Sequence, residues 1–178
     1  WDNSIKYIEE AQTAYPEEKL YADYEIEVLM KSDRMDEAVE SLNEIIAKGG
    51  AKASQYYALA YLQWNNENWE EAQKAAIQAV EVKPDHHDAL YIAGSIYYND
   101  AAALLKEANN ETDNAKYEEK RMQAVNLFKL AQPFFEKAHN VRPEEISYMA
   151  PLSTIYDQLD MDTERDAILK KMESIGGE

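Results

Sequence analysis

Apolar residues recur along this chain at the three- and four-residue spacings of amphipathic helices, and short polar or Gly/Pro links separate these runs. The pattern predicts helices with short connections between them. Their expected ranges are 1–15, 18–31, 35–48, 53–65, 69–82, 86–108, 113–141, 144–159 and 162–175. Because Gly and Pro together number only 10, a turn-rich β fold is disfavoured. The sequence therefore predicts an all-α fold of about nine helices.

Self-comparison of the sequence shows a period of 34 residues, which is typical of a repeat architecture. Four columns agree on it: the large apolar residues Trp1, Met35 and Trp69; the small residues Ser4, Ala38 and Ala72; Ala11, Ile45 and Ala79; and the helix breakers Pro16, Gly50 and Pro84. A single helix hairpin cannot bury its apolar face alone, so hairpins of this kind must stack.

The third repeat carries an insertion of 25 residues. Phe128, Ala131, Ala138 and Pro143 keep the internal spacing of Trp69, Ala72, Ala79 and Pro84, but they follow 59 residues later, which is 34 plus 25. The insertion, near 99–124, has a turn cluster at 109–114 and predicts an antiparallel hairpin that projects by roughly 18 Å. Its helices are expected to bring Ala101, Leu104, Leu105 and Ala108 against Tyr117, Met122 and Val125.

Two prolines fall inside predicted helices. Pro133 is expected to kink the helix over 113–141, and Pro151 is expected to interrupt the helix over 144–159.

The repeat resembles the tetratricopeptide family, through Trp69-Glu70-Glu71-Ala72 with Ala79 and Pro84, through Leu90, Gly94 and Tyr97, and through Phe128, Ala131, Phe135, Ala138 and Pro143. The resemblance implies one domain, a right-handed solenoid of helix hairpins with an extended hairpin in the third repeat. Its expected parts are a half repeat at 1–16, regular repeats at 17–50 and 51–84, the enlarged repeat at 85–143 and a capping hairpin at 144–178.

The resemblance also bears on the origin of the chain. Trp1 would fall in the middle of a repeat, so we expect a piece of a longer array; a natural start at an unpaired helix is the alternative. The long helices and the insertion resemble envelope-associated bacterial repeat proteins, which favours a periplasmic or cell-envelope location over the cytoplasm.

In this family the first helix of each hairpin lines a concave groove, which implies a binding surface here. The two middle repeats give the candidate set Tyr57, Tyr61, Trp64, Asn65, Asp88, Tyr91, Ser95, Tyr98 and Asn99. The outer repeats give Leu20, Asp23, Glu27, Met30 and Lys31, and Ser147, Ala150, Thr154, Asp157 and Gln158. Aromatic rings edged by amides suit an extended peptide or a partner helix, with sugars as a second possibility; alternatively, some rings pack between helices.

Members of the family that bind chaperone tails clamp a terminal carboxylate with Lys and Arg. The matching positions here are Asp23, Tyr57, Tyr91 and Ser95, so no carboxylate clamp is expected. Acidic Asp23 and Glu27 at one edge of the groove instead favour a neutral or basic segment.

The charge of the chain argues against several partners. The net charge is −17, from 35 acidic and 18 basic residues, and no basic stripe is present. Nucleic-acid binding needs Lys and Arg to neutralise phosphates, and an anionic membrane would repel this chain. No apolar run approaches the roughly 20 residues of a membrane-spanning helix.

Nothing in the sequence predicts catalysis, a cofactor or a metal. Cysteine is absent, and the neighbours His86 and His87 would point about 100° apart on a helix, which is poor chelating geometry. Asp85 and Asp88 beside them fit a helix N-terminus.

The sequence therefore predicts a non-catalytic protein-interaction scaffold. The alternatives are a self-assembling subunit of an envelope complex, in contact through its own copy or the projecting arm, and a carbohydrate-binding helper.

Overall fold

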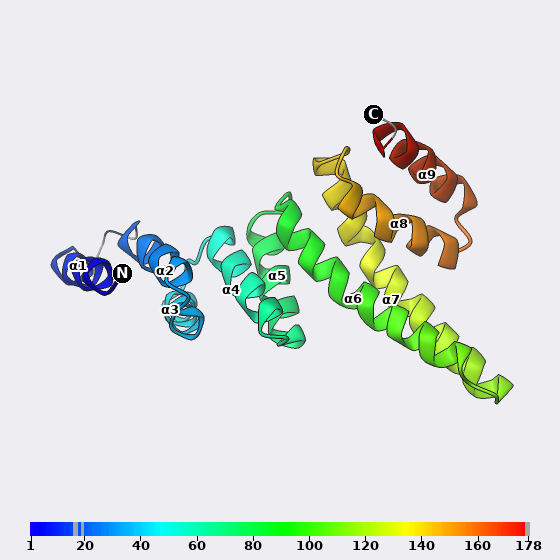
Figure 1. Ribbon diagram of the computed structural model, residues 1–178, viewed down its shortest axis with the longest axis horizontal. Coiled ribbons are helices and arrows are strands. Elements are labelled where there is room, and N and C mark those ends of the chain that lie inside the picture. The colour runs from blue at the N-terminus through cyan, green and yellow to red at the C-terminus, as the bar shows by residue number, and fades with distance from the viewer. Residues whose placement is uncertain (16–17, 19, 177–178) are drawn as a thin grey trace. The chain divides into compact units, whose positions relative to one another are not determined.

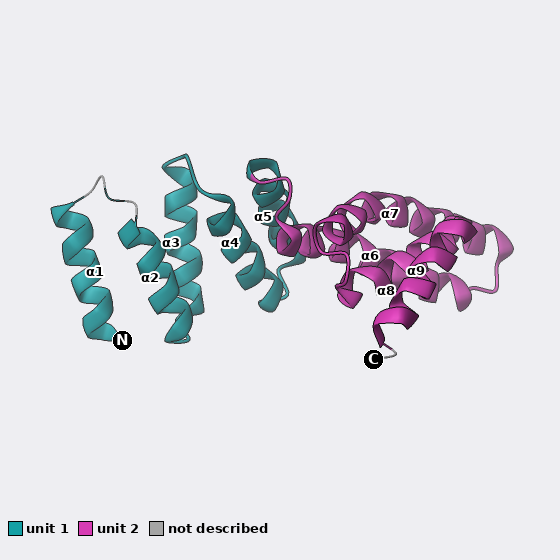
Figure 2. Ribbon diagram, turned by 90° about the horizontal axis from the view of Figure 1, so that it is seen from above, with its two compact units in different colours: residues 1–82 teal, residues 83–178 magenta. Residues whose placement is uncertain are grey.

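The computed structural model describes residues 1–15, 18 and 20–176, and all regular structure within them is helical. Helices α1 to α5 form one compact unit, residues 1–82, and α6 to α9 form a second, residues 83–178. Figure 2 shows the two units in different colours.

The helices of the first unit are α1 (Asp2–Ala14), α2 (Leu20–Lys31), α3 (Met35–Ala47), α4 (Ala53–Asn65) and α5 (Trp69–Val82). Those of the second are α6 (His87–Asn109), α7 (Asn114–Val141), α8 (Ile146–Gln158) and α9 (Asp162–Gly176). Every expected helix is confirmed with ends within two residues. Pro16, one of the expected breakers, and the expected repeat boundary at 16/17 lie outside the described residues.

Small residues let the paired helices of unit 1 approach closely. Ala38 on α3, and Ala72 and Ala76 on α5, are fully buried where these helices meet their partners α2 and α4. Ser4, the equivalent of Ala38 in α1, is exposed. The repeat period thus corresponds to a seam of small side chains in the complete hairpins, and this seam is open in α1.

The insertion forms the outer part of a long α6–α7 hairpin (Figure 1). Its turn ends at Asp113, whose side chain caps α7 by accepting hydrogen bonds from the backbone N–H groups of Ala115 and Lys116. The two helices meet along Ala101, Ala108 and Ala124, all fully buried.

One expected contact of this hairpin is wrong, because Met122 is 63% exposed. The buried positions Phe128 and Ala131 continue toward the hairpin tip at Ala124, four and seven residues earlier. A residue two positions before Ala124 lies about 200° away around the helix, so Met122 points to solvent.

The core of unit 2 gathers around Phe128 and Phe135 of α7, with Met149, Leu152 and Ile155 of α8 packed against them. Helix α8 is one helix from Ile146 to Gln158 with Pro151 inside it, so the expected interruption does not occur. Helix α7 runs from Asn114 to Val141 and contains Pro133, where the expected kink stays a prediction. Within the described chain, no helix combines the length and apolar character needed to cross a membrane.

Candidate binding surface

Helix α4 carries the first part of the expected surface as a row of rings. Tyr57, Tyr61 and Trp64 follow one another at spacings of four and three residues, so they lie on one side of the helix. The ring centroids of Tyr57 and Tyr61 are 6.4 Å apart. Tyr61 is 42% exposed, while Tyr57 and Trp64 are half-buried. Asn65 ends the helix and is exposed. This row therefore offers apolar area with one open ring at its centre.

Helix α5 fixes the end of the α4 row. The indole of Trp69, the first residue of α5, meets that of Trp64 edge to face at 5.2 Å between centroids. At the other end, the Gln55 side chain accepts a hydrogen bond from the Lys52 backbone N–H, which holds the first turn of α4. The row thus stands on a helix with both ends anchored, which limits the entropy that a bound partner would have to remove.

Helix α6 carries the second part, and its rings are closer to the core. Tyr91 meets Phe135 edge to face at 5.9 Å, and Tyr98 meets Phe128 and Phe135 in the same way at 5.6 and 6.1 Å. Both tyrosines are half-buried. The possibility that rings of the candidate set pack between helices therefore holds for these two, although each keeps part of its surface exposed.

The polar members of the α6 set differ in accessibility. Ser95 is only 6% exposed, so its hydroxyl is not at the surface. The Asp88 carboxylate lies 3.0 Å from Nδ1 of His87, and Asn99 is exposed. Of this group, Asp88 and Asn99 remain accessible to a ligand beside Tyr91 and Tyr98.

Sequence reasoning missed the partner of this α6 cluster. The Tyr148 ring of α8 lies 5.7 Å from Tyr91, and its hydroxyl is 3.0 Å from Nδ1 of His87. The groove position expected from the sequence is Ser147, one residue away. Since Tyr148 lies 61 residues beyond His87 with an insertion between them, no spacing within one sequence indicates this contact.

The acidic edge expected on α2 is largely compensated. Asp23 pairs with Lys52 at 2.5 Å and accepts a hydrogen bond from Gln55 at 2.6 Å. Glu27 pairs with Lys31 at 2.5 Å on the same helix. This edge therefore carries less free negative charge than the sequence alone indicates.

His86 and His139 of unit 2 are shifted toward their neutral form. Burial lowers the pKa of His86, and burial together with Lys171 lowers the pKa of His139. Over the described residues, no group of three or more His, Asp or Glu side chains has the geometry to hold a metal ion.

Comparison with known proteins identifies the repeat. Residues 57–114 match the family model described as tetratricopeptide repeat, and this segment contains the whole candidate set from Tyr57 to Asn99. The segment 57–114 is therefore similar to tetratricopeptide repeats. No curated protein sequence matches the chain.

Solved structures share the fold across nearly the whole chain. The crystal structure of MamA superimposes with a TM-score of 0.65 at 17% identity, covering 97% of this chain and 86% of that one. A second MamA crystal structure gives 0.64 at 17% identity, with 98% and 80% covered. A monomeric mutant of IFIT1 with Gppp-AAAA gives 0.63 at 12% identity, with 94% of this chain but only 35% of IFIT1 covered. At these identities the likeness concerns the fold alone.

Proposed function

We propose that the chain is a non-catalytic protein-interaction scaffold, and that the α4 row of Tyr57, Tyr61 and Trp64 binds an extended peptide or a partner helix. Tetratricopeptide solenoids work through extended concave surfaces on their stacked hairpins. The observation that carries the proposal is Tyr61, an open ring held between two half-buried rings on an anchored helix. Tyr and Trp combine large contact area, few rotatable bonds and a polar tip, so they dominate binding energies.

The α6 cluster contributes less in this proposal. Tyr91 and Tyr98 bury part of their ring surface against Phe135 and Phe128. Removing either tyrosine ring would therefore disturb the core of unit 2. Asp88 and Asn99 beside them can bond peptide groups of a ligand. The test therefore concentrates on α4, where ring removal leaves the core intact.

The experiment is capture of partners from a lysate of the source organism, followed by titration of the captured protein or its binding segment. Three proteins are compared: the native chain, Tyr61→Ala, and Tyr24→Ala as a matched control. Tyr24 lies on α2 in the same unit and is 46% exposed, close to the 42% of Tyr61, but it is outside the candidate set.

We expect the native chain and Tyr24→Ala to capture the same partner. Tyr61→Ala should weaken binding by about thirtyfold, because loss of a central aromatic anchor costs about 2 kcal/mol. Equal affinity of all three proteins would show that the α4 row is not the binding surface.

A second candidate, self-association, is favoured by a different observation. Three aromatic residues before, on and after α1 are each more than 60% exposed: Trp1, Tyr7 and Tyr15. Light-scattering mass measured from micromolar to millimolar concentration tests it. Growth of the mass with concentration, abolished by Tyr7→Ser, would support self-association, and a constant monomer mass would exclude it in this range.

A further inference from the structure

Unit 1 contains a polar cavity apart from the α4 row. It has a volume of about 490 Å³ and lies among α1, α2 and α3, with the link before α4 at one end. This is the size of a small-molecule site. Its walls include Glu9, Gln12, Tyr15, Ala22, Glu25, Ser41 and Glu44, together with the lysines Lys48 and Lys52.

A second, smaller cavity of about 230 Å³ lies at the equivalent place one repeat later, among α3, α4 and α5. Adding 34 to each number converts walls of the first cavity into walls of the second. Thus Glu9, Gln12, Ala22, Glu25, Ser41 and Glu44 become Asn43, Ile46, Tyr56, Leu59, Ala75 and Gln78. The second cavity is therefore an internal reference for what this position of the repeat requires structurally.

The first cavity is larger than the second and is lined by more polar side chains. Ala22 stands where Tyr56 fills the later repeat, which explains the larger volume. Glu25 stands where the later repeat has Leu59, which is buried. A carboxylate in an interhelical position is unfavourable unless it gains compensating contacts. Packing of the repeat thus favours Leu at this position, so a carboxylate here indicates a role other than packing.

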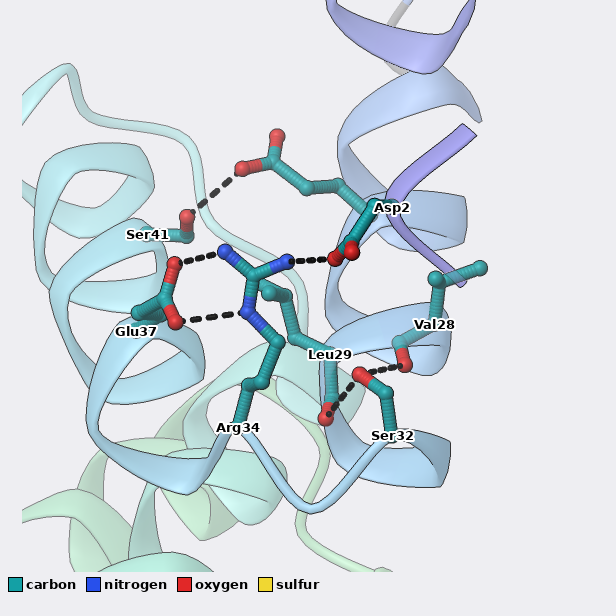
Figure 3. A network of polar contacts seen from close by, with 8 residues as sticks. Asp2, Val28, Leu29, Ser32, Arg34, Glu37 and Ser41 are labelled. Carbon is teal, nitrogen blue, oxygen red and sulfur yellow. Dashed lines mark hydrogen bonds and ion pairs between the residues drawn. The ribbon is translucent and has the colours of Figure 1, made fainter. Parts of the chain in front are cut away.

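The Glu25 carboxylate is held in one orientation. One of its oxygens accepts a hydrogen bond from the Gln12 amide of α1 at 2.6 Å, and the other accepts from the Ser41 hydroxyl of α3 at 2.8 Å. Figure 3 shows Ser41 turned from α3 toward α2. Both donors are neutral, and each carboxylate oxygen keeps further acceptor capacity. The two lysines in the cavity wall are paired with other carboxylates, Lys48 with Glu44 at 3.8 Å and Lys52 with Asp23 at 2.5 Å. Among the described side chains, no Lys or Arg forms an ion pair with Glu25 within 4.0 Å.

We propose that this cavity binds a cationic group, an alkylammonium or a guanidinium, with Glu25 as its anchor. The oriented carboxylate supplies a charge-assisted hydrogen bond, Glu9 adds negative potential, and the Tyr15 ring at the rim can cover the cation through its π face. The cation can belong to a free small amine or to an Arg or Lys side chain of a bound protein segment, since both present the same chemistry.

The experiment uses two probes on the full chain: agmatine as the free cation, and the peptide acetyl-Ala-Ala-Arg-Ala-Ala-amide as the side-chain source. Binding is followed by isothermal titration calorimetry and by backbone amide shifts of α1 to α3. Each variant takes the residue of the later repeat: Glu25→Leu removes the anchor, and Ser41→Ala removes one orienting donor. Tyr61→Ala serves as the control for the α4 row.

We expect at least one probe to bind the native chain and Tyr61→Ala equally, with amide shifts confined to the cavity. Glu25→Leu should weaken that binding at least tenfold, and Ser41→Ala should weaken it less. Agmatine binding alone indicates a free amine as the ligand, and peptide binding alone indicates a protein side chain. If neither probe binds, or if Glu25→Leu binds as well as the native chain, the proposal is wrong, whatever the outcome for the α4 row.

Glu25→Leu is also expected to keep the fold, because the later repeat already accommodates Leu59 at this position. A thermal unfolding midpoint equal to or above that of the native chain is the check. Should the variant unfold, Glu25→Gln keeps the shape of the side chain while removing the charge, and the same tenfold weakening is then required of it.

Discussion

Gly94 lies at a close approach of α6 to α7, and Gly94→Ala tests how tightly unit 2 is packed. A Cβ atom at this position would lie 3.0 and 3.1 Å from two ring carbons of Phe135 and 3.1 Å from Cβ of Phe134. Ordinary carbon–carbon contacts are about 3.5–4.0 Å, so the neighbours would have to retreat by roughly 0.5 Å. The Phe135 ring cannot retreat freely, because it is fully buried and Tyr91 and Tyr98 meet it edge to face.

The expected loss follows from two opposing effects. Overpacking of a filled core costs about 1–3 kcal/mol, whereas Ala in a helix interior is about 1 kcal/mol more favourable than Gly. We therefore expect Gly94→Ala to lower the free energy of unfolding by about 1 kcal/mol. Urea titration followed by far-ultraviolet circular dichroism measures this change, with Gly176→Ala as the control, since a Cβ at that glycine meets nothing within 4 Å.

A double-mutant cycle makes the test specific. In a Phe135→Leu background the two contacts with the Phe135 ring are removed and only the one with Cβ of Phe134 remains, so Gly94→Ala should be less destabilising there. If Gly94→Ala stabilises the native background by about 1 kcal/mol, as at an open helical site, the reasoning about this contact is refuted.

Three further predictions concern single contacts. Gly49→Ala should destabilise unit 1 by about 1 kcal/mol in urea titration, because Gly49 has φ +82°, a left-handed conformation that disfavours a side chain; an unchanged midpoint would contradict this. Arg34→Gln should speed amide hydrogen exchange in α1, most at low salt, since Arg34 bonds Asp2 of α1 at 3.3 Å as well as Glu37 (Figure 3); exchange equal to the native rate would show that the link is unimportant. Stability should fall as pH drops from 7.5 to 5.5, because the lowered pKa of His139 means that the unfolded chain takes up its proton first, near pH 6.5; His139→Gln should flatten this profile, and an identical slope would exclude the histidine as its cause.

The helices could be predicted closely because local signals agree with the repeat. The 34-residue period ties together small residues such as Ala38 and Ala72, and both prove fully buried where paired helices meet. Contacts inside the insertion are harder to predict from the sequence, since the insertion has no counterpart in the other repeats. A single sequence does not fix the register there. It predicts Met122 toward the partner helix, whereas the buried residues Phe128 and Ala131 lead to Ala124 instead.

The candidate surface could be predicted only in part. Helical spacing is enough to put Tyr57, Tyr61 and Trp64 on one side of α4, because that depends on one helix alone. How much of a ring is left open depends on residues from elsewhere in the chain, as Tyr91 shows by its contacts with Phe135 and Tyr148. The role of Glu25 was hidden for a related reason. Its significance appears only when the cavity beside it is compared with the one beside Leu59.

The α6–α7 hairpin also has a consequence for the order in which the chain folds. Its helices are the longest in the described structure and are joined by the short turn 110–113, so their contacts close small loops of chain. Closing a short loop loses little entropy, and structure rich in near-neighbour contacts forms quickly. The alanine seam at Ala101, Ala108 and Ala124 needs no large side chains to find their rotamers before the helices meet. The hairpin is therefore suited to act as the nucleus on which α8 and α9 condense.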